Sequence, residues 1–180
     1  MLTRTMNTAL VSIIMGSDSD LAVMKDAAVV LEQFGITAEI RILSAHRVPE
    51  HLVTYIKDAE GRGCKAFIAG AGVAAALPGT IAAHTSLPVI GVPLTSNSSA
   101  AGGLDAILSI VQMPPGVPVA TVCLNGAKNA GILAAQIIGA GNETVRAAIV
   151  SYKENMTKDL LAKDQKLQDV GYKKYLEGKA

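Results

Sequence analysis

The segment Ser44–Arg47 places a serine, an alanine, a histidine and an arginine directly after an apolar run that ends at Leu43. The imidazole of His46 can change its protonation state near neutral pH, which suits general acid–base catalysis. The planar guanidinium of Arg47 can bind a phosphate through paired hydrogen bonds. These residue types at this spacing indicate acid–base chemistry on a small phosphorylated molecule. The alternative is a helix capped by Ser44 that carries two ordinary surface side chains.

A second polar segment, Gly16–Asp20, follows the apolar residues 9–15 and precedes a helical pattern. The first turn of a helix offers free backbone N–H groups and a partial positive charge, which favour a bound phosphate. Ser17 and Ser19 can add hydroxyl donors, and the Asp20 carboxylate can accept hydrogen bonds from ribose hydroxyls. A well-capped helix with solvated aspartates is the competing interpretation. The segment matches neither a Walker loop nor the dinucleotide-binding glycine pattern.

A third segment, Gly70–Gly72, follows the apolar residues 65–69 and is expected to close that strand as a turn. Its minimal side chains would let the backbone approach a ligand closely, although a tight contact between strand and helix would need the same residues. The carboxyl ends of parallel strands meet at one edge of a sheet, so the three segments are expected to converge there. The polar residues 96–99 are interpreted as a solvated loop rather than a lid.

The elements that must position these segments alternate between strand and helix along the chain. Short apolar runs predict strands at residues 9–15, 36–43, 65–69, 88–92 and 117–122. Apolar residues at helical spacing predict helices at residues 21–34, 49–61, 77–85, 104–112 and 126–138. Such alternation with short connections predicts an α/β fold with a doubly wound parallel sheet and right-handed crossovers.

We expect three parts along the chain: a flexible N-terminus at residues 1–8, a single α/β catalytic domain at residues 9–141 and a C-terminal helical tail at residues 142–180. The tail is charged, but four residues form one apolar stripe: Val145, Ile149, Tyr152 and Met156. Such a stripe must be buried against its own subunit or a neighbouring one.

Composition limits the partners. The 180 residues carry a net charge of only +1, so the sequence has no excess of positive charge that would attract nucleic acid or an anionic membrane. No stretch is typical of a signal peptide or a membrane span. Half of the residues are hydrophobic and 17% are charged, which favours a homo-oligomer with buried subunit surface. Cys64 and Cys123 lie in apolar runs without metal-ligand spacing, so we expect reduced, buried thiols in a cytoplasmic protein and no metal site.

Four motifs occur in a characteristic order: MGSDSD at residues 15–20, SAHRVP at 44–49, AGAG at 69–72 with LPG at 77–79, and LSIVQMPPGVPVATV at 108–122. Together they closely resemble the N5-carboxyaminoimidazole ribonucleotide mutases, the catalytic subunit of phosphoribosylaminoimidazole carboxylase, over roughly residues 11–138. The resemblance implies a flavodoxin-like three-layer sandwich, assembly into an octamer, and no metal, biotin or ATP as cofactor. It also implies conversion of N5-carboxyaminoimidazole ribonucleotide to 4-carboxyaminoimidazole ribonucleotide in purine biosynthesis.

The resemblance assigns roles to individual residues. It implies that His46 is the general acid/base and that Arg47 binds the substrate. Ser17 and Asp20 match the first nucleotide-binding motif of the family, and Ser19 is expected to help hold the phosphate. The remaining residues expected around the nucleotide are Ser44, Ala45, Ala71, Gly72 and Leu77.

The family has two branches: one moves a carboxyl group from an exocyclic nitrogen to a ring carbon, and the other adds free CO2 to aminoimidazole ribonucleotide. His-Arg at residues 46–47 and IVQMP at residues 110–114 resemble the mutase branch. The usual mutase pattern Gly-Gly-Ala-Ala-His-Leu-Pro-Gly is altered here, with Val73 at its second glycine and Ala76 at its histidine. A role for that second histidine therefore does not carry over. Direct carboxylation with free CO2, and a non-catalytic flavin- or nucleotide-binding module, are the alternative functions.

Overall fold

The computed structural model describes residues 9–178, which leaves the predicted flexible segment 1–8 outside the described residues. One sheet of five strands runs in the order β2-β1-β3-β4-β5. Every neighbouring pair of strands is parallel. The strands are β1 (Val11–Met15), β2 (Ala38–Ile42), β3 (Ala66–Gly72), β4 (Val89–Leu94) and β5 (Ala120–Thr121). This is the strand order of flavodoxin-like sheets, so the predicted fold class is confirmed.

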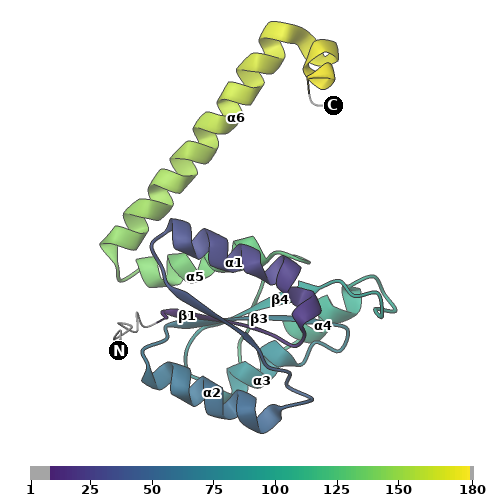
Figure 1. Cartoon of the computed structure of the whole chain (residues 1–180), viewed down its shortest axis with the longest axis vertical. Helices are drawn as coiled ribbons and strands as arrows, with labels where there is room; N and C mark the ends of the chain where they lie inside the picture. The colour runs from purple at the N-terminus through teal and green to yellow at the C-terminus, as the bar shows by residue number, and fades with distance from the viewer. Residues whose placement is uncertain (1–8, 179–180) are drawn as a thin grey trace, which may run out of the picture.

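Helices cover both faces of the sheet and make a three-layer sandwich (Figure 1). One face carries α1 (Leu21–Gln33) and α5 (Ala127–Gly139), and the other carries α2 (Pro49–Gly61) and α3 (Leu77–His84). A short 3-10 turn, η1 (Asp18–Asp20), leads into α1, and α4 (Leu104–Val111) packs against β4 and β5. The last helix, α6 (Glu143–Glu177), leaves the body of the molecule.

The core lies on both sides of β1, whose five residues are all buried. Ile13 and Met15 pack toward α1 and α5, whereas Ile14 packs among the side chains of α2 and α3. Burial on both faces is expected for a central parallel strand and explains why β1 is apolar apart from Ser12. On α5, a Cβ added to Gly131 would lie 2.5 Å from a methyl group of Val30, so this glycine permits the close approach of α1 and α5.

A polar network anchors α2, the helix that follows the histidine-bearing loop. The hydroxyl oxygens of Ser12 on β1 and Tyr55 on α2 lie 2.7 Å apart, and Tyr55 also donates to the Glu39 carboxylate at 3.1 Å. Arg62 donates to the same carboxylate at 2.8 Å. Burial raises the pKa of Tyr55 to about 12, so its hydroxyl stays protonated and able to donate. These bonds hold α2, and the loop before it, on the sheet.

Two of the predicted boundaries at strand ends were wrong. The Gly70–Gly72 segment is not a turn but the end of β3, because it continues to pair with β4 as far as Gly72 opposite Leu94. The predicted strand at residues 117–122 is reduced to the two residues of β5. Pro118 has no N–H to donate, and Gly116 has a positive φ of 95°, so the chain cannot pair along this whole stretch.

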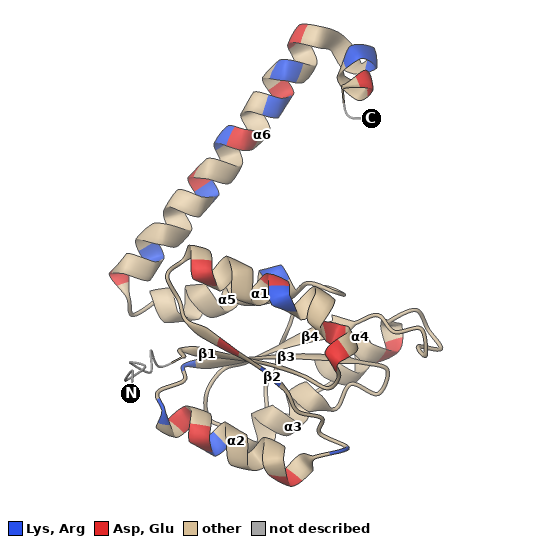
Figure 2. Ribbon diagram, viewed as in Figure 1, with Lys and Arg blue, Asp and Glu red and all other residues tan. Residues whose placement is uncertain are grey.

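The first three residues of the predicted apolar stripe of the tail pack on the body of the same subunit. Val145 and Ile149 are buried against the core, and the Tyr152 ring meets Phe34 edge-to-face at 5.3 Å. Met156 is 55% exposed, because the helix has by then moved away from the body. Positive and negative side chains alternate along the projecting part of α6 (Figure 2). Across residues 9–178, none of the helices combines the length and apolarity that crossing a membrane requires.

Candidate active site

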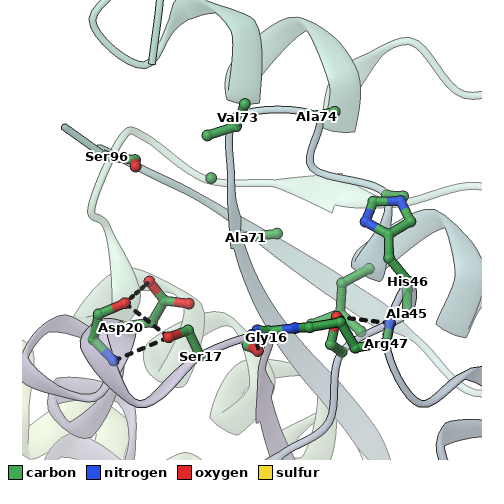
Figure 3. Close-up of a pocket in the computed structure, with 15 residues that line it drawn as sticks. Gly16, Ser17, Asp20, Ala45, His46, Arg47, Ala71, Val73, Ala74 and Ser96 are labelled. Atoms are coloured by element: carbon green, nitrogen blue, oxygen red, sulfur yellow. Dashed lines mark hydrogen bonds between the residues drawn. The ribbon is translucent and has the colours of Figure 1, made fainter. Parts of the chain in front are cut away.

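A pocket of about 450 Å³ opens at the carboxyl end of the sheet. It lies between β1 and β3, where the order of the strands in the sheet reverses, which is the position at which open α/β sheets bind ligands. All of the residues predicted for the site line this pocket (Figure 3). The structure adds Gly16, Val73, Ala74, Ala76 and Ser96 to them. The three predicted segments therefore converge, and their individual roles remain predictions.

The loop after β1 supplies a polar wall. The Ser17 hydroxyl oxygen accepts hydrogen bonds from the backbone N–H of Ser19 at 3.4 Å and from the Ser19 hydroxyl at 3.0 Å. Burial raises the pKa of Asp20, and this outweighs the lowering by hydrogen bonds from Ser17 and Ser19 and by the charge of Arg47. The wall thus offers hydroxyl donors at a helix start together with one carboxylate that can accept hydrogen bonds.

The Arg47 guanidinium reaches across from the loop after β2. It donates a hydrogen bond to the backbone carbonyl of Gly16, and the backbone N–H of Arg47 donates to the Ser44 hydroxyl at 3.3 Å. Ser44 therefore closes the turn at residues 44–47, whereas the residue that precedes α2 is Val48 and makes no side-chain cap. The alternative interpretation of Ser44 as a helix cap is wrong. The guanidinium is placed beside the serine-rich start of η1, where a phosphate would meet both.

His46 lies on the opposite side of the pocket from Asp20 (Figure 3). Its side chain is exposed, and no residue in the described part of the chain hydrogen-bonds the imidazole. An imidazole in this setting is available to a bound molecule through both of its nitrogens. The geometry therefore permits proton transfer to and from a ligand whose phosphate is bound on the other side.

Small apolar residues form the third wall of the pocket, between the end of β3 and the start of α3. It consists of Ala71, Val73, Ala74, Ala76 and Leu77. Ala76 immediately precedes α3, at the position where the mutase pattern has a histidine. No side chain of this wall can form a hydrogen bond. The pocket is thus polar where a phosphate and a ribose would bind and apolar beside His46.

Three residues that line the pocket are absent from the set predicted from the sequence for reasons that can be identified: Val73, Ala76 and Ser96. The polar composition of residues 96–99 predicts a solvated loop, yet Ser96 follows β4 and so lies at the same sheet edge as the other segments. In the sequence, Val73 and Ala76 stand out only as departures from the mutase pattern. The signal that could have identified Ser96 as a pocket residue is its position shortly after a strand of the parallel sheet.

Other expectations about reactive groups can be compared with the structure. Cys64 is buried, and burial raises the pKa of its thiol. Cys123 is exposed, so the expectation that both thiols are buried was wrong; the apolar run around it ends as the chain leaves the short β5. Within residues 9–178, no three His, Cys, Asp or Glu side chains gather closely enough to hold a metal ion.

Comparison with known proteins identifies the family. Residues 10–159 match the family model described as AIR carboxylase. N5-carboxyaminoimidazole ribonucleotide mutase of Thermotoga maritima is 57% identical over 94% of this chain and 98% of its own length. Phosphoribosylaminoimidazole carboxylase of Schizosaccharomyces pombe is 53% identical over 92% of this chain, which matches 30% of that longer protein. The crystal structure of Treponema denticola PurE has a TM-score of 0.79 and 35% identity, covering 87% of this chain and 97% of that one. The chain therefore belongs to the AIR carboxylase family.

Proposed function

We propose that this protein is an isomerase that converts N5-carboxyaminoimidazole ribonucleotide to 4-carboxyaminoimidazole ribonucleotide in purine biosynthesis. The observation that carries the proposal is the lone imidazole of His46, placed across the pocket from the serine-rich η1 loop, toward which the neighbouring Arg47 extends its guanidinium. Six relatives that bear the mutase name share 47% to 57% identity with this chain, which covers 90% to 98% of their lengths. These relatives support the choice of substrate.

The substrate is bound by its phosphate and ribose. The phosphate lies between the Arg47 guanidinium and the hydroxyls of Ser17 and Ser19, and Asp20 accepts hydrogen bonds from the ribose. Ser44 and Ala45 flank the nucleotide on one side, with Ala71, Gly72 and Leu77 on the other. This arrangement directs the aminoimidazole ring toward His46 and the apolar wall.

The reaction then needs only one proton-transferring side chain. The bond between the exocyclic nitrogen and its carboxyl carbon breaks, CO2 leaves, and the nitrogen keeps the electron pair and gains a proton. The nucleophilic ring carbon attacks the CO2 to form the new carbon–carbon bond, and the proton on that carbon is then removed. His46 can donate the first proton and accept the second, because it stays beside the ring throughout. The pocket contributes by holding CO2 against the ring carbon. No added carboxyl donor is required, since the substrate brings its own.

Carboxylation of aminoimidazole ribonucleotide by free CO2 is the second candidate, because two relatives are named phosphoribosylaminoimidazole carboxylase. The chain matches only 30% of each of those proteins. The mutase is therefore favoured.

The two candidates are separated by offering the purified protein each substrate alone. Synthetic N5-carboxyaminoimidazole ribonucleotide should be converted, as followed by absorbance, in preference to aminoimidazole ribonucleotide with bicarbonate. A protein that is inert toward the first and carboxylates the second would be a carboxylase. Tight binding of a flavin without turnover of either substrate would indicate a binding module instead.

We also propose that the protein works as a cytoplasmic homo-octamer. Apolar side chains are exposed on α4, where Leu104, Leu108 and Val111 are 52%, 44% and 53% exposed, and on the projecting α6. Such surfaces are typical of subunit contacts. Residues 9–141 would then form the catalytic unit, with residues 142–180 as an extension that contacts a neighbouring subunit. Light scattering of the full chain should give eight times the mass of one subunit, and a monomer would contradict the assembly.

A further inference from the structure

A second cavity, of about 350 Å³, shares three of its residues with the pocket at the carboxyl end of the sheet. Ser19, Asp20 and Ser96 line both cavities. Asp20 and Ser96 lie on the same side of the pocket, opposite His46 (Figure 3). A bound molecule whose reacting ring faces His46 therefore presents a different part of its structure to Asp20 and Ser96.

The position of Ser96 is set by contacts of the loop that follows β4. A Cβ added to Gly72 would lie 3.5 Å from the Ser96 Cβ, so Ser96 lies against the end of β3. The preceding residue, Thr95, is bonded to Asn125, whose side-chain oxygen accepts the Thr95 N–H at 3.0 Å and whose amide donates to the Thr95 hydroxyl at 3.0 Å. Ser96 is thus held next to Gly72, a residue predicted to lie around the nucleotide.

The Ser96 hydroxyl group can still donate a hydrogen bond to a ligand. Its oxygen accepts the backbone N–H of Ser98 at 3.2 Å, and no group within residues 9–178 accepts its proton. Asp20 has the complementary need, because an ionised carboxylate only accepts hydrogen bonds. The Ser19 hydroxyl donates to it at a long 3.5 Å, and burial raises the pKa of Asp20. Further donors from a ligand would stabilise its charged form.

A donor and an acceptor that face one cavity match a pair of neighbouring hydroxyl groups, since each hydroxyl can both donate and accept. A phosphate does not fit between them, because the Asp20 carboxylate would repel it. The ring of the proposed substrate belongs on the side of His46. The 2′ and 3′ hydroxyls of the ribose are the part of that substrate that matches Asp20 and Ser96 together.

We propose that Ser96 is a specificity-determining residue that donates a hydrogen bond to one ribose hydroxyl while Asp20 accepts one from the other. This inference rests on the proposed mutase function and adds a residue of the β4 loop to its substrate site. A site built to hydrogen-bond a hydroxyl rejects an analogue that lacks it, because the polar groups of the site are then left unpaired. Ser96 therefore favours ribonucleotides over their deoxy forms.

The inference is tested by measuring dissociation constants by calorimetry for wild type, Ser96→Ala and Ser96→Thr. The ligands are 4-carboxyaminoimidazole ribonucleotide and its 2′-deoxy and 3′-deoxy forms. Ser96→Ala should bind the parent ribonucleotide about 2- to 12-fold more weakly than the wild type, as expected for loss of one neutral hydrogen bond. It should bind one of the two deoxy forms, the one that lacks the hydroxyl bonded to Ser96, as the wild type does. Ser96→Thr keeps the hydroxyl and should keep the wild-type pattern.

Two controls separate this role from a general effect on the loop. Ser98→Ala changes a neighbouring serine that lines neither cavity, and it should leave all three dissociation constants unchanged. The thermal midpoint of Ser96→Ala should stay close to that of the wild type. If Ser96→Ala binds the parent ribonucleotide normally, or binds all three ligands more weakly by the same factor, the inference is overturned while wild-type turnover leaves the mutase function standing. A wild-type protein that neither binds the parent ribonucleotide nor converts N5-carboxyaminoimidazole ribonucleotide would overturn both.

Discussion

The Arg47 guanidinium donates a hydrogen bond to the carbonyl oxygen of Gly16, and so joins the loops that follow β2 and β1. The bond places the positive charge of the site beside the start of η1. The two elements proposed to bind the phosphate are therefore joined by a contact within the protein itself, which reduces the ordering that binding requires.

Arg47→Ala should weaken substrate binding much more than it slows saturated turnover, because the proposed phosphate site lies far from the atoms proposed to react. Hydrogen bonds to charged groups are worth about 1.5–3 kcal/mol, so KM should rise roughly 10- to 150-fold with little change in kcat. Arg146→Ala is the matched control, since Arg146 forms only an exposed ion pair with Glu143. An unchanged KM would reject this role. With a dephosphorylated substrate, the variant and the wild type should bind alike.

His46→Asn should remove most of the activity and leave the fold intact. Loss of general acid–base catalysis costs about 10²- to 10⁴-fold in rate. The imidazole is exposed and has no hydrogen-bond partner in the described structure, so the thermal midpoint should be unchanged. Substrate binding, measured by calorimetry, should also be nearly unaffected. His84→Asn, at an exposed histidine on α3, provides the control. Near-native turnover of His46→Asn would disprove the proton-transfer role.

Asp20→Asn should lower the affinity for substrate but should not lower the free energy of unfolding at neutral pH. Burial raises the pKa of Asp20 in the folded protein, so ionisation of this carboxyl opposes folding at any pH above its unfolded pKa. The asparagine variant should therefore be at least as stable as the wild type at neutral pH. That advantage should disappear below about pH 4, where the wild-type carboxyl is also neutral in the unfolded chain. Urea titrations across this pH range measure the effect. A less stable variant at neutral pH would contradict it.

The same substitution should raise KM, because an amide is a weaker acceptor for ribose hydroxyls than a carboxylate. Asp26→Asn, on the exposed surface of α1, is the control for loss of one negative charge. An unaltered KM would remove Asp20 from the substrate-binding set while leaving the stability argument intact.

Ala76→His should change turnover by less than about tenfold, or roughly 1.4 kcal/mol in barrier height. Ala76 has ordinary helical φ and ψ of −72° and −21°, and its side chain is exposed at the pocket, so an imidazole can be accommodated there. The proposed mechanism requires one titrating group, and His46 is proposed to supply it. A much larger gain in kcat would show that a second imidazole takes part in the chemistry and that this chain works without it.

The place of the candidate active site in the fold was predictable, because it depends on where the strands end. Ser44–Arg47 follows an apolar run, and any residue directly after a strand of a parallel sheet lies at the binding edge. The left-handed backbone at Val73 was not predictable, since valine by itself favours extended structure. Ser96 was missed because a solvated loop and a ligand-binding loop have the same polar composition.

The pocket walls come from separate strand–helix units: one follows β1, one follows β2, and the apolar wall joins β3 to α3. The hydrogen bond from Arg47 to Gly16 joins the first two units, whereas Val73, Ala74 and Ala76 of the third unit are exposed. Substitutions at these three positions can therefore change the apolar wall without displacing Arg47 or the η1 loop. Variants at these positions offer a direct route to reshaping the apolar side of the pocket while its polar side stays in place.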